Sequence, residues 1–331
     1  MQKSGLDDES SLIFAESLVN ADMRGISSHG MTRLATYSRR LQDGLVSKST
    51  DVKIIKDSPS LLLIDGQNGM GAVTAYRTME LCLDRASENG CCFAAVKGGN
   101  HFGYAAYFTE YAALKGMIGV AIANGPVAIA PTGGSQPMLG TNPISISVPT
   151  KNCPTIVLDM ATSIVARGKI TLAKKEGRLI SDNWGVDIDG YPTTDPAKVH
   201  AMLPFGGAKG FGISLITEVL SSCLSGAKDG LTMGSFYDFS SIQESGFFLG
   251  AFNVSSIMPL NMFKDSVDSL INSIKQSPKA PGVSEIMIAG EIEQNNYENA
   301  LGEGVELSEV VVGELIELST KLGVPFDCNF K

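Results

Sequence analysis

Two of the three histidines in this chain of 331 residues stand among glycines and small polar residues. His29 lies in GISSHGMTR and His101 in VKGGNHFGYAAYF, whereas His200 has apolar neighbours ahead of a proline, which favours a structural role. Neighbouring glycines leave the backbone free to turn tightly and let a ligand approach the imidazole ring closely. We therefore expect His29 and His101, but not His200, to face a ligand.

The chemistry open to these two histidines is narrowed by what their neighbours lack. Neither has a cysteine or histidine partner at metal-ligand spacing, so we expect no metal site. The chain contains no G-x-S-x-G elbow, and Ser27 and Ser28 face the wrong way for activation by the adjacent His29 ring, which disfavours nucleophilic hydrolysis. General acid or base catalysis by a neutral imidazole remains, and it suits redox chemistry at a hydroxyl or carbonyl group.

An arginine and a tyrosine follow His29 at helical spacing. Arg33 stands four residues after His29, and Tyr37 stands eight residues after it. On one continuous helix these side chains and Ser28 would share a face, and the guanidinium could bind a carboxylate through two hydrogen bonds. A solvated arginine and a half-buried tyrosine on an ordinary helix fit the same spacing, so the sequence alone leaves both interpretations open.

Two glycine-rich segments invite comparison with nucleotide-binding loops. GQNGMGAVT lacks the third glycine and the later acidic residue of the dinucleotide fingerprint, which favours a tight turn between a strand and a helix. GGAKGFGISL places Lys209 at the start of an expected helix, where backbone N–H groups and an ammonium could hold a phosphate. A simple turn explains this second segment equally well.

The elements that must position these residues follow from hydrophobic periodicity and from glycine and proline breaks. Apolar Leu12, Ala15 and Val19 recur at helical spacing near the N-terminus. A similar stripe near the C-terminus, after the capping residue Ser308, consists of Val311, Leu315, Leu318 and Leu322. Further helices are expected at 75–89, at 103–115 and after 210, and strands at 60–66, 91–96 and 155–161 and within 116–150. This order predicts a mixed α/β protein.

Charge and cysteine content limit the partners and the compartment. A formal charge of −9 argues against nucleic acid or an anionic membrane as a partner, because binding phosphates requires a clustered basic face. The uncharged stretch 116–150 is broken by prolines and glycines into pieces too short to span a bilayer. Six cysteines without a C-x-x-C pair, and no charged-then-apolar leader, lead us to expect a cytoplasmic protein with reduced thiols.

Several long motifs in this order resemble the malate/L-lactate/ureidoglycolate dehydrogenase family, a nicotinamide-dependent group unrelated to the Rossmann malate and lactate dehydrogenases. They are DMRGISSHGMTRLATY, GGNHFGYAAYF, GTNPISISVP, VLDMATSIVARGKI, DIDGYPTTDP and LPFGGAKGFGISL. The resemblance implies an α/β fold with a mixed-sheet, non-Rossmann NAD(P)-binding domain at 61–304. It also implies a helical substrate and dimerisation domain built from both chain ends, 1–60 together with 305–331, and a homodimer.

The resemblance also assigns roles to residues. The family's S-H-G motif falls on Ser28 and His29, with Arg33 and Tyr37 as substrate contacts, and the second histidine motif falls on His101. Either histidine could transfer the proton; we favour His101 and keep His29 as the alternative or as a hydrogen-bond donor. The implied cofactor-binding residues are Asp159, Met160, Ala161, Thr162, Ser163, Lys209, Gly210, Gly290 and Glu291. The last two stand in a turn where Ala289 replaces the family's proline.

The expected activity is reversible hydride transfer between NAD, or alternatively NADP, and a small 2-hydroxy acid of the malate or L-lactate type. Pro126 stands where ureidoglycolate-type members carry an aspartate, which argues for a smaller acid than ureidoglycolate. Sulfolactate, diketogulonate and cyclic-imine carboxylates are alternative substrates within the same family. A catalytically silent nucleotide- or metabolite-binding protein is the alternative from another class, and the presence of both histidines and Arg33 counts against it.

Overall fold

The computed structural model describes residues 1–326 and contains a seven-stranded mixed sheet with the strand order β1-β2-β3-β9-β4-β5-β6. β2 and β3 pair in parallel, and all other neighbouring strands in this sheet pair antiparallel. The strands are β1 Lys53–Asp57, β2 Leu61–Asp65, β3 Cys91–Gly99, β4 Met117–Ala123, β5 Ile144–Val148, β6 Ile156–Met160 and β9 Ser245–Asn253, with β7 Gly185–Val186 and β8 Ala201–Met202 forming a separate ribbon. The predicted mixed α/β fold is confirmed.

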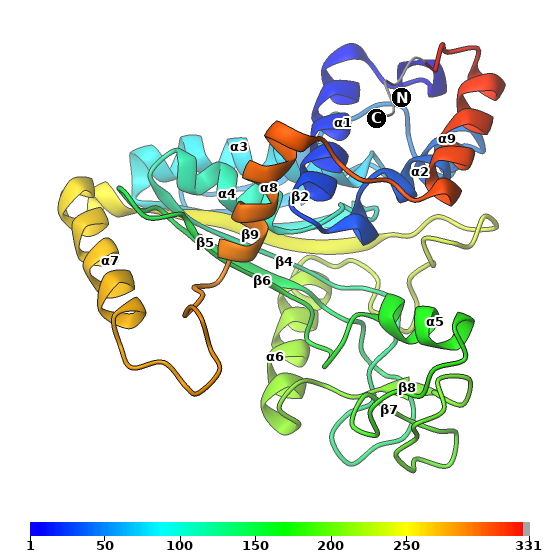
Figure 1. Ribbon diagram of the computed structural model, residues 1–331. Coiled ribbons are helices and arrows are strands. Elements are labelled where there is room, and N and C mark those ends of the chain that lie inside the picture. Colours follow the sequence, from blue (N-terminus) through cyan, green and yellow to red (C-terminus); the bar gives the residue numbers. More distant parts are fainter. Residues whose placement is uncertain (327–331) are drawn as a thin grey trace.

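Helices surround this sheet (Figure 1). They are α1 Asp8–Met23, α2 Leu34–Gln42, α3 Gly71–Asn89, α4 Ala106–Leu114, α5 Arg167–Lys175, α6 Ala208–Glu218, α7 Leu260–Lys275, α8 Glu291–Glu303 and α9 Glu309–Leu322. α3 packs on β3 and β9, and α4 packs on β4 and β5. The predicted inner face of α3 is confirmed, because Ala75, Met79 and Cys82 are fully buried, and Gly90 ends the helix with a φ of 85°. Among the described residues, no helix is both long and apolar enough to cross a bilayer.

Helices from the two ends of the chain lie side by side above the sheet (Figure 1), with α9 packed on α2 and α8 packed on α1. Ser308 caps α9 as predicted, since its hydroxyl accepts a hydrogen bond from the N–H of Val311 at 3.4 Å. Leu315 of the predicted stripe is buried, whereas Val310, outside the stripe, is 71% exposed. The division into two domains stays a prediction, but its boundary at residue 60 moves, because β1 pairs with β2 and therefore belongs to the sheet.

The predicted N-terminal helix is confirmed as α1, but the apolar residues whose spacing indicated it do not form its buried face. Leu12 and Val19 are 60% and 46% exposed, whereas Phe14 is fully buried and packs edge-on against a tyrosine of α2. Small serines complete the buried side of the helix, with Ser10 at 0% and Ser17 at 4% exposure. Ile13 and Leu18 are buried on the same side, so the true face is also apolar and periodic, but serines interrupt it and the exposed leucine and valine form a competing stripe.

The segment that carries His29 and Arg33 is not the single helix that their spacing suggested. Two 3₁₀ turns, Ser27–His29 and Met31–Arg33, precede α2 and are separated by Gly30. A side chain at Gly30 would collide with the carboxylate of Asp22, because an added Cβ would lie 1.9 Å from Oδ1. That carboxylate accepts a hydrogen bond from the N–H of Met31 at 2.7 Å and so fixes the second turn.

The two other helices next to predicted site residues begin close to their expected positions. α4 begins at Ala106, three residues later than predicted, because Gly103 has a φ of 86° and leaves His101 in a loop after β3. α6 begins at Ala208, three residues earlier than predicted. Both shifts are of the size by which sequence patterns commonly misplace helix ends.

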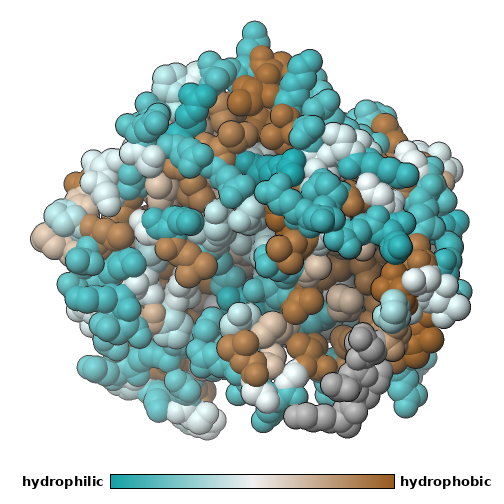
Figure 2. Space-filling view, turned by 90° about the horizontal axis from the view of Figure 1, so that it is seen from above, coloured by the Kyte–Doolittle hydropathy of each residue, from teal (hydrophilic) through white to brown (hydrophobic). Residues whose placement is uncertain are grey.

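Figure 2 shows the molecule from above the chain-end helices, where hydrophobic groups are interspersed with hydrophilic ones. The large apolar side chains exposed on these helices include Leu12 on α1, Leu301 on α8 and Val310 on α9. Scattered apolar residues of this kind are normal on a protein surface.

Candidate active site

A cavity of about 740 Å³ is lined by residues from distant segments of the chain. Ser28, His29 and Arg33 reach it from the turns before α2, and His101 reaches it from the loop after β3. A second group of lining residues, which we call the carboxyl end, includes Arg24, Glu110, Asp159, Met160, Ala161, Arg167, Gly290 and Glu293. The fold therefore brings both predicted ligand-facing histidines to one cavity.

The two imidazole rings are stacked. The ring centroids of His29 and His101 are 5.5 Å apart, and the ring planes differ by 12°. The backbone N–H of His101 donates to Oε1 of Gln243 at 2.9 Å, and the hydroxyl of Ser28 lies 2.9 Å from Nδ1 of His29. Ser28 thus holds the His29 ring, and Gln243 holds the backbone of His101.

The hydrogen bonds around His101 identify which ring nitrogen is left for a ligand. The Tyr37 hydroxyl is hydrogen bonded to Nδ1 of His101, and the N–H of Gly103 donates to the same nitrogen at 3.3 Å. A nitrogen that accepts an N–H carries no proton, so the neutral ring carries its proton on Nε2. Tyr37 is 2% exposed and does not line the cavity, so the structure places it behind the His101 ring.

Burial and neighbouring charge keep both histidines neutral. Desolvation, with a smaller contribution from the Arg33 guanidinium, lowers the pKa of His29 to about 4. Desolvation also lowers the pKa of His101, and the nearby His29 and Arg33 lower it further. Burial raises the pKa of Tyr37 above that of an ordinary phenol. At neutral pH this end of the cavity therefore holds uncharged rings beside one fixed cation.

Arg33 is held in place by one hydrogen bond and by aromatic rings. Its Nε donates to the carbonyl oxygen of Ser28 at 2.6 Å. Its guanidinium carbon lies 5.1 Å from the ring centroid of Tyr237 and 5.7 Å from that of Phe236. Its two terminal nitrogens have no hydrogen-bond partner within residues 1–326 and can therefore bind a carboxylate as a fork.

Sequence reasoning missed the aromatic residues and the glutamine that support the histidines. The Phe236 ring lies 4.8 Å from the rings of both His101 and Tyr37, and Gln243 holds the backbone of His101. These residues come from a segment without regular structure before β9 and match no motif. Only the adjacent aromatic pair of Phe236 and Tyr237 could have drawn attention to it.

The carboxyl end of the cavity holds three acidic residues and two arginines. Arg24 forms an ion pair with Glu110 at 2.9 Å, and Asp159 accepts a hydrogen bond from the N–H of Ala106 at 3.2 Å. Desolvation raises the pKa of Glu110 to about 7, against the opposing effect of Arg24 and with added repulsion from Asp159 and Glu293. Desolvation likewise raises the pKa of Asp159 to about 7. Burial therefore outweighs the hydrogen bond and the cation that favour the ionised forms.

Comparison with known proteins places the chain in a family. The family model described as malate/L-lactate dehydrogenase matches residues 1–316. The chain belongs to the malate/L-lactate dehydrogenase family. The malate dehydrogenase of Pyrococcus horikoshii is 36% identical over 336 residues, which cover 98% of this chain and 92% of that protein. The ureidoglycolate dehydrogenase (NAD⁺) of Escherichia coli K12 is 31% identical over 318 residues, covering 95% of this chain and 90% of the relative.

A solved structure extends the comparison to the fold. The sulfolactate dehydrogenase of Methanocaldococcus jannaschii superposes with a TM-score of 0.92 at 39% identity, over 98% of this chain and 93% of the other. The three relatives are named for three different hydroxy acids. Membership of this dehydrogenase family is therefore shown, and the particular acid is not.

In this family member, four of the nine predicted cofactor-binding residues line the cavity. They are Asp159, Met160, Ala161 and Gly290. The hydroxyl of Thr162 instead donates to the carbonyl oxygen of Thr141 at 2.9 Å, and that of Ser163 donates to the carbonyl oxygen of Val165 at 2.7 Å. Both hydroxyls support the loop after β6 and do not face the cavity.

The remaining predicted cofactor residues also lie outside the cavity lining. Glu291 forms an ion pair with Lys275 at 2.8 Å and accepts a hydrogen bond from the N–H of Ile288 at 2.8 Å. Gly210 packs so closely that an added Cβ would lie 2.0 Å from the carbonyl oxygen of Phe205, and Lys209 is exposed at the start of α6. His200, predicted to be structural, forms a hydrogen bond with Gln136 at 2.9 Å.

Proposed function

We propose that this protein catalyses reversible, NAD(P)-dependent interconversion of a small 2-hydroxy acid and its 2-oxo acid, of the malate or L-lactate type. The proposal is carried by the meeting of two stacked histidines and a clamped arginine at one end of a single cavity. Family membership supports the dehydrogenase class. A bound nicotinamide cofactor supplies the hydride or accepts it.

The residues of the histidine end divide the remaining work. Arg33 binds the substrate carboxylate through its two free nitrogens, and a lysine could not reproduce this fork. His101 exchanges a proton with the substrate oxygen at Nε2, because its Nδ1 is bonded to Tyr37. Ser28 and His29 orient the same oxygen, and His29 stays the alternative proton donor.

Tyr37 allows His101 to work in both directions. To take a proton from the hydroxy acid, Nε2 must be unprotonated, so the ring's own proton lies on Nδ1; the phenolic oxygen then accepts a hydrogen bond from it and directs its own O–H to the carbonyl oxygen of His101, 3.5 Å away. The doubly protonated ring formed in this way releases the proton to solvent or, in reduction, gives it from Nε2 to the substrate oxygen and is left neutral. When the neutral ring instead carries its proton on Nε2, the Tyr37 hydroxyl donates to Nδ1. Tyr37 thus acts through His101, whereas the resemblance had suggested that it contacts the substrate.

The carboxyl end of the cavity fits the nicotinamide half of the cofactor. Apolar Leu158, Ile288 and Ile292 can cover a flat ring, and the carboxyl groups of Asp159 and Glu110 can bind amide and hydroxyl groups. Of the predicted residues, Asp159, Met160, Ala161 and Gly290 are the ones that would hold it there. We propose NAD as the cofactor, with NADP as the alternative, and a cytoplasmic location on the basis of the sequence alone.

Assays with a panel of substrates test the function. The panel consists of malate, lactate, sulfolactate, ureidoglycolate, diketogulonate and a cyclic-imine carboxylate, each assayed with both cofactors. Nicotinamide absorbance measures turnover, and we expect turnover with a small hydroxy acid. Pro126, on which the expectation against ureidoglycolate was based, lies outside the cavity lining, so the rate with ureidoglycolate tests that expectation directly. Tight binding of NADH without turnover of any acid would favour the silent binding protein instead.

A homodimer is part of the proposal, and α6 is the surface that supports it. This helix and the π-helical turn after it, Val219–Cys223, bury serine, threonine and glycine and expose apolar residues. The exposed residues, each at 40% to 59%, are Ile213, Leu215, Ile216, Val219 and Leu224. An apolar face with no exposed charged residue among 211–225 fits a matching face on a second copy.

Light scattering after size-exclusion chromatography tests this surface. Ile216→Glu, at the centre of the face, should convert a dimer into a monomer, because two buried carboxylates would have no partners. Leu114→Glu, at an isolated leucine that is 82% exposed on α4, should leave the dimer intact. A monomeric native protein, or an unchanged dimer in Ile216→Glu, would remove α6 from the interface.

A further inference from the structure

Arg40 on α2 is a fully buried charge outside the cavity lining. Its guanidinium donates to four backbone carbonyl oxygens, those of Ser235, Phe236, Asp238 and Ser241, at 3.4, 3.4, 2.6 and 3.1 Å. None of these bonds goes to a carboxylate, although the carboxylate of Asp238 in the same segment favours the charged guanidinium through space. The direct hydrogen bonds of the guanidinium thus all hold backbone. Burying a guanidinium is costly unless its hydrogen bonds replace the lost hydration.

The four carbonyls all belong to residues 235–241, which we call the strap. The strap carries the two aromatic rings that touch the histidine end of the cavity. Phe236 packs against His101 at 4.8 Å, and Tyr237 packs against the guanidinium of Arg33 at 5.1 Å. Just beyond the strap, Gln243 accepts the backbone N–H of His101.

Residues of α2 and of the turn before it contact both the strap and His101. Arg33, Tyr37 and Arg40 follow at spacings of four and three residues, which places them on one face. Tyr37 is hydrogen bonded to His101. Arg33 contacts the ring of Tyr237 in the strap, and Arg40 donates to backbone carbonyl oxygens of the strap. Arg39 adds a stack on Phe239, with its guanidinium carbon 3.8 Å from the ring centroid.

We propose that Arg40 is a positioning residue that, by holding the strap, fixes His101 and Arg33 in the relative placement needed for proton transfer and carboxylate binding. The inference rests on the proposed function. It assigns a role to a residue and a segment that no sequence motif marks. Misplacing a reacting group by about 1 Å can cost on the order of 100-fold in rate.

Arginine is required here because of its shape. Its planar fork offers donors on two terminal nitrogens, and these reach carbonyls spread over seven consecutive residues of the strap. A lysine keeps the charge but has a single nitrogen, so Arg40→Lys should free part of the strap without leaving a void as large as an alanine would. This makes Arg40→Lys the informative variant.

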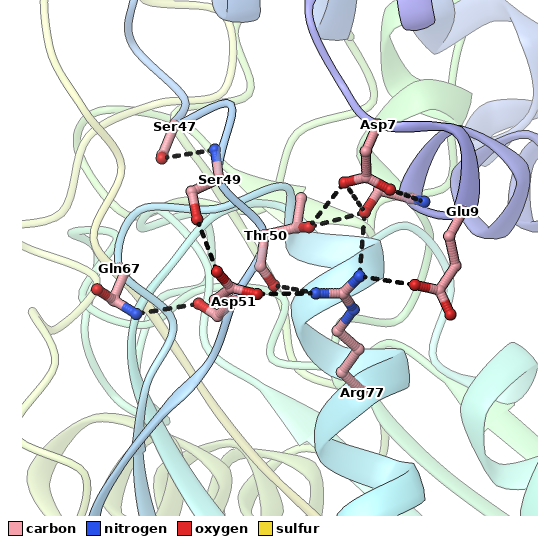
Figure 3. A network of polar contacts seen from close by, with 9 residues as sticks. Asp7, Glu9, Ser47, Ser49, Thr50, Asp51, Gln67 and Arg77 are labelled. Atoms are coloured by element: carbon pink, nitrogen blue, oxygen red, sulfur yellow. Dashed lines mark hydrogen bonds and ion pairs between the residues drawn. The ribbon is translucent and has the colours of Figure 1, made fainter.

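Arg77→Lys is the matched control. Arg77, on α3, also ties distant segments together, since it donates to the carbonyl oxygen of Thr50 at 3.2 Å and pairs with Glu9 at 3.1 Å (Figure 3). It lies outside the cavity that holds the histidines. Arg77→Lys therefore also weakens a contact between distant segments, but an effect on the histidine end should be confined to Arg40→Lys, and the Tm of both variants measures their loss of general stability.

Three measurements on the full-length protein test the proposal. In Arg40→Lys, kcat/KM for the acid should fall about tenfold or more, with a lower kcat and a higher KM, while the Kd for NADH, measured by fluorescence titration, should change less than about twofold. Amide hydrogen exchange in residues 235–241 should accelerate. The ¹⁵N resonances of the His101 ring, one of only three histidines, should shift. Arg77→Lys should show none of these changes.

Two results would overturn the positioning role. One is faster exchange in the strap with unchanged kcat/KM and unchanged His101 resonances, and the other is an Arg40→Lys protein whose strap exchanges as in the native protein. Absence of turnover in the native protein with every acid would instead contradict the proposed function. In that case the exchange and the His101 resonances still decide whether Arg40 and the strap hold the ring.

Discussion

At the histidine end of the cavity burial keeps two imidazole rings uncharged beside Arg33, and at the carboxyl end burial holds Glu110 and Asp159 back from ionising. The pKa of His29 is lowered to about 4, while the pKa values of Glu110 and Asp159 are raised to about 7. Both shifts have the same first cause, desolvation of the charged form. The protein therefore lines a poorly solvated cavity with one proton-exchanging end and one end whose charge changes near neutral pH.

This difference separates two properties that are often attributed to the same residue. Near pH 7 the histidines are neutral and do not titrate, whereas the carboxyl groups do. Turnover should depend on the histidine end, and the pH dependence of the folded state near neutrality should depend on the carboxyl end. Substitutions at each end can test whether the two properties separate in this way.

The largest expected effect comes from His101→Gln. A well-placed general acid contributes on the order of 10²–10⁴ in rate, so this variant should lose most of its turnover while still binding NADH. Steady-state kinetics and a fluorescence titration of NADH measure the two quantities. His200→Gln, which removes a histidine bonded to Gln136 outside the cavity, should retain activity. Near-normal turnover in His101→Gln would mean that His29 is the proton donor or that the proposed mechanism is wrong.

A smaller effect, and a different kinetic signature, is expected from Arg33→Lys. Hydrogen bonds to charged groups contribute about 1.5–3 kcal/mol, and losing the fork should raise KM for the acid roughly 10–100-fold with a smaller change in kcat. Arg85→Lys, at a surface ion pair with Asp57, should leave KM unchanged. An unaltered KM in Arg33→Lys would show that Arg33 does not bind the carboxylate.

Local pattern was sufficient to predict strands β2 to β6, helices α1, α3, α4, α6 and α9, and the two histidines that line the cavity, because glycine turns and periodic apolar residues occupy neighbouring positions. It did not predict β1, the central strand β9, or helices α5, α7 and α8. The sequence could not predict the supports of His101. Tyr37 is 64 residues from His101 in the chain, and Gln243 is 142 residues away. Spacing had suggested that Tyr37 faces the ligand from a continuous helix, but Gly30 breaks that helix and the packing of Phe14 on Tyr37 buries the ring.

The cofactor residues show the same limit in another form. The whole segment from Asp159 to Ser163 matched the family motif, yet only its first three residues line the cavity, since Thr162 and Ser163 turn back to bond the backbone. A motif records which residues occur together and does not record which of them face the ligand. That distinction depends on the antiparallel pairing of β5 and β6 and on the loop that follows.

The smallest expected effect is a change in how stability depends on pH, measured in Asp159→Asn. Because the pKa of Asp159 is raised from 3.8 to about 7 on folding, the folded chain holds this proton more tightly than the unfolded chain does. Its stabilising contribution is therefore complete below about pH 4 and is lost as the pH rises toward 7. Asparagine cannot ionise, so the Tm of the variant should gain on that of the native protein by a few degrees between about pH 5 and 8.

The sign of this change separates the carboxyl end from the histidine end. His29, with a lowered pKa, stabilises the folded state above about pH 6.5, and that contribution is lost as the pH falls toward 4, so it cannot produce a loss on raising the pH. Thermal unfolding across this range measures the difference, with Asp189→Asn on the exposed surface as the control. Parallel Tm curves for Asp159→Asn and the native protein would mean that Asp159 is already ionised in the cavity, and that only one end of the cavity is poorly solvated.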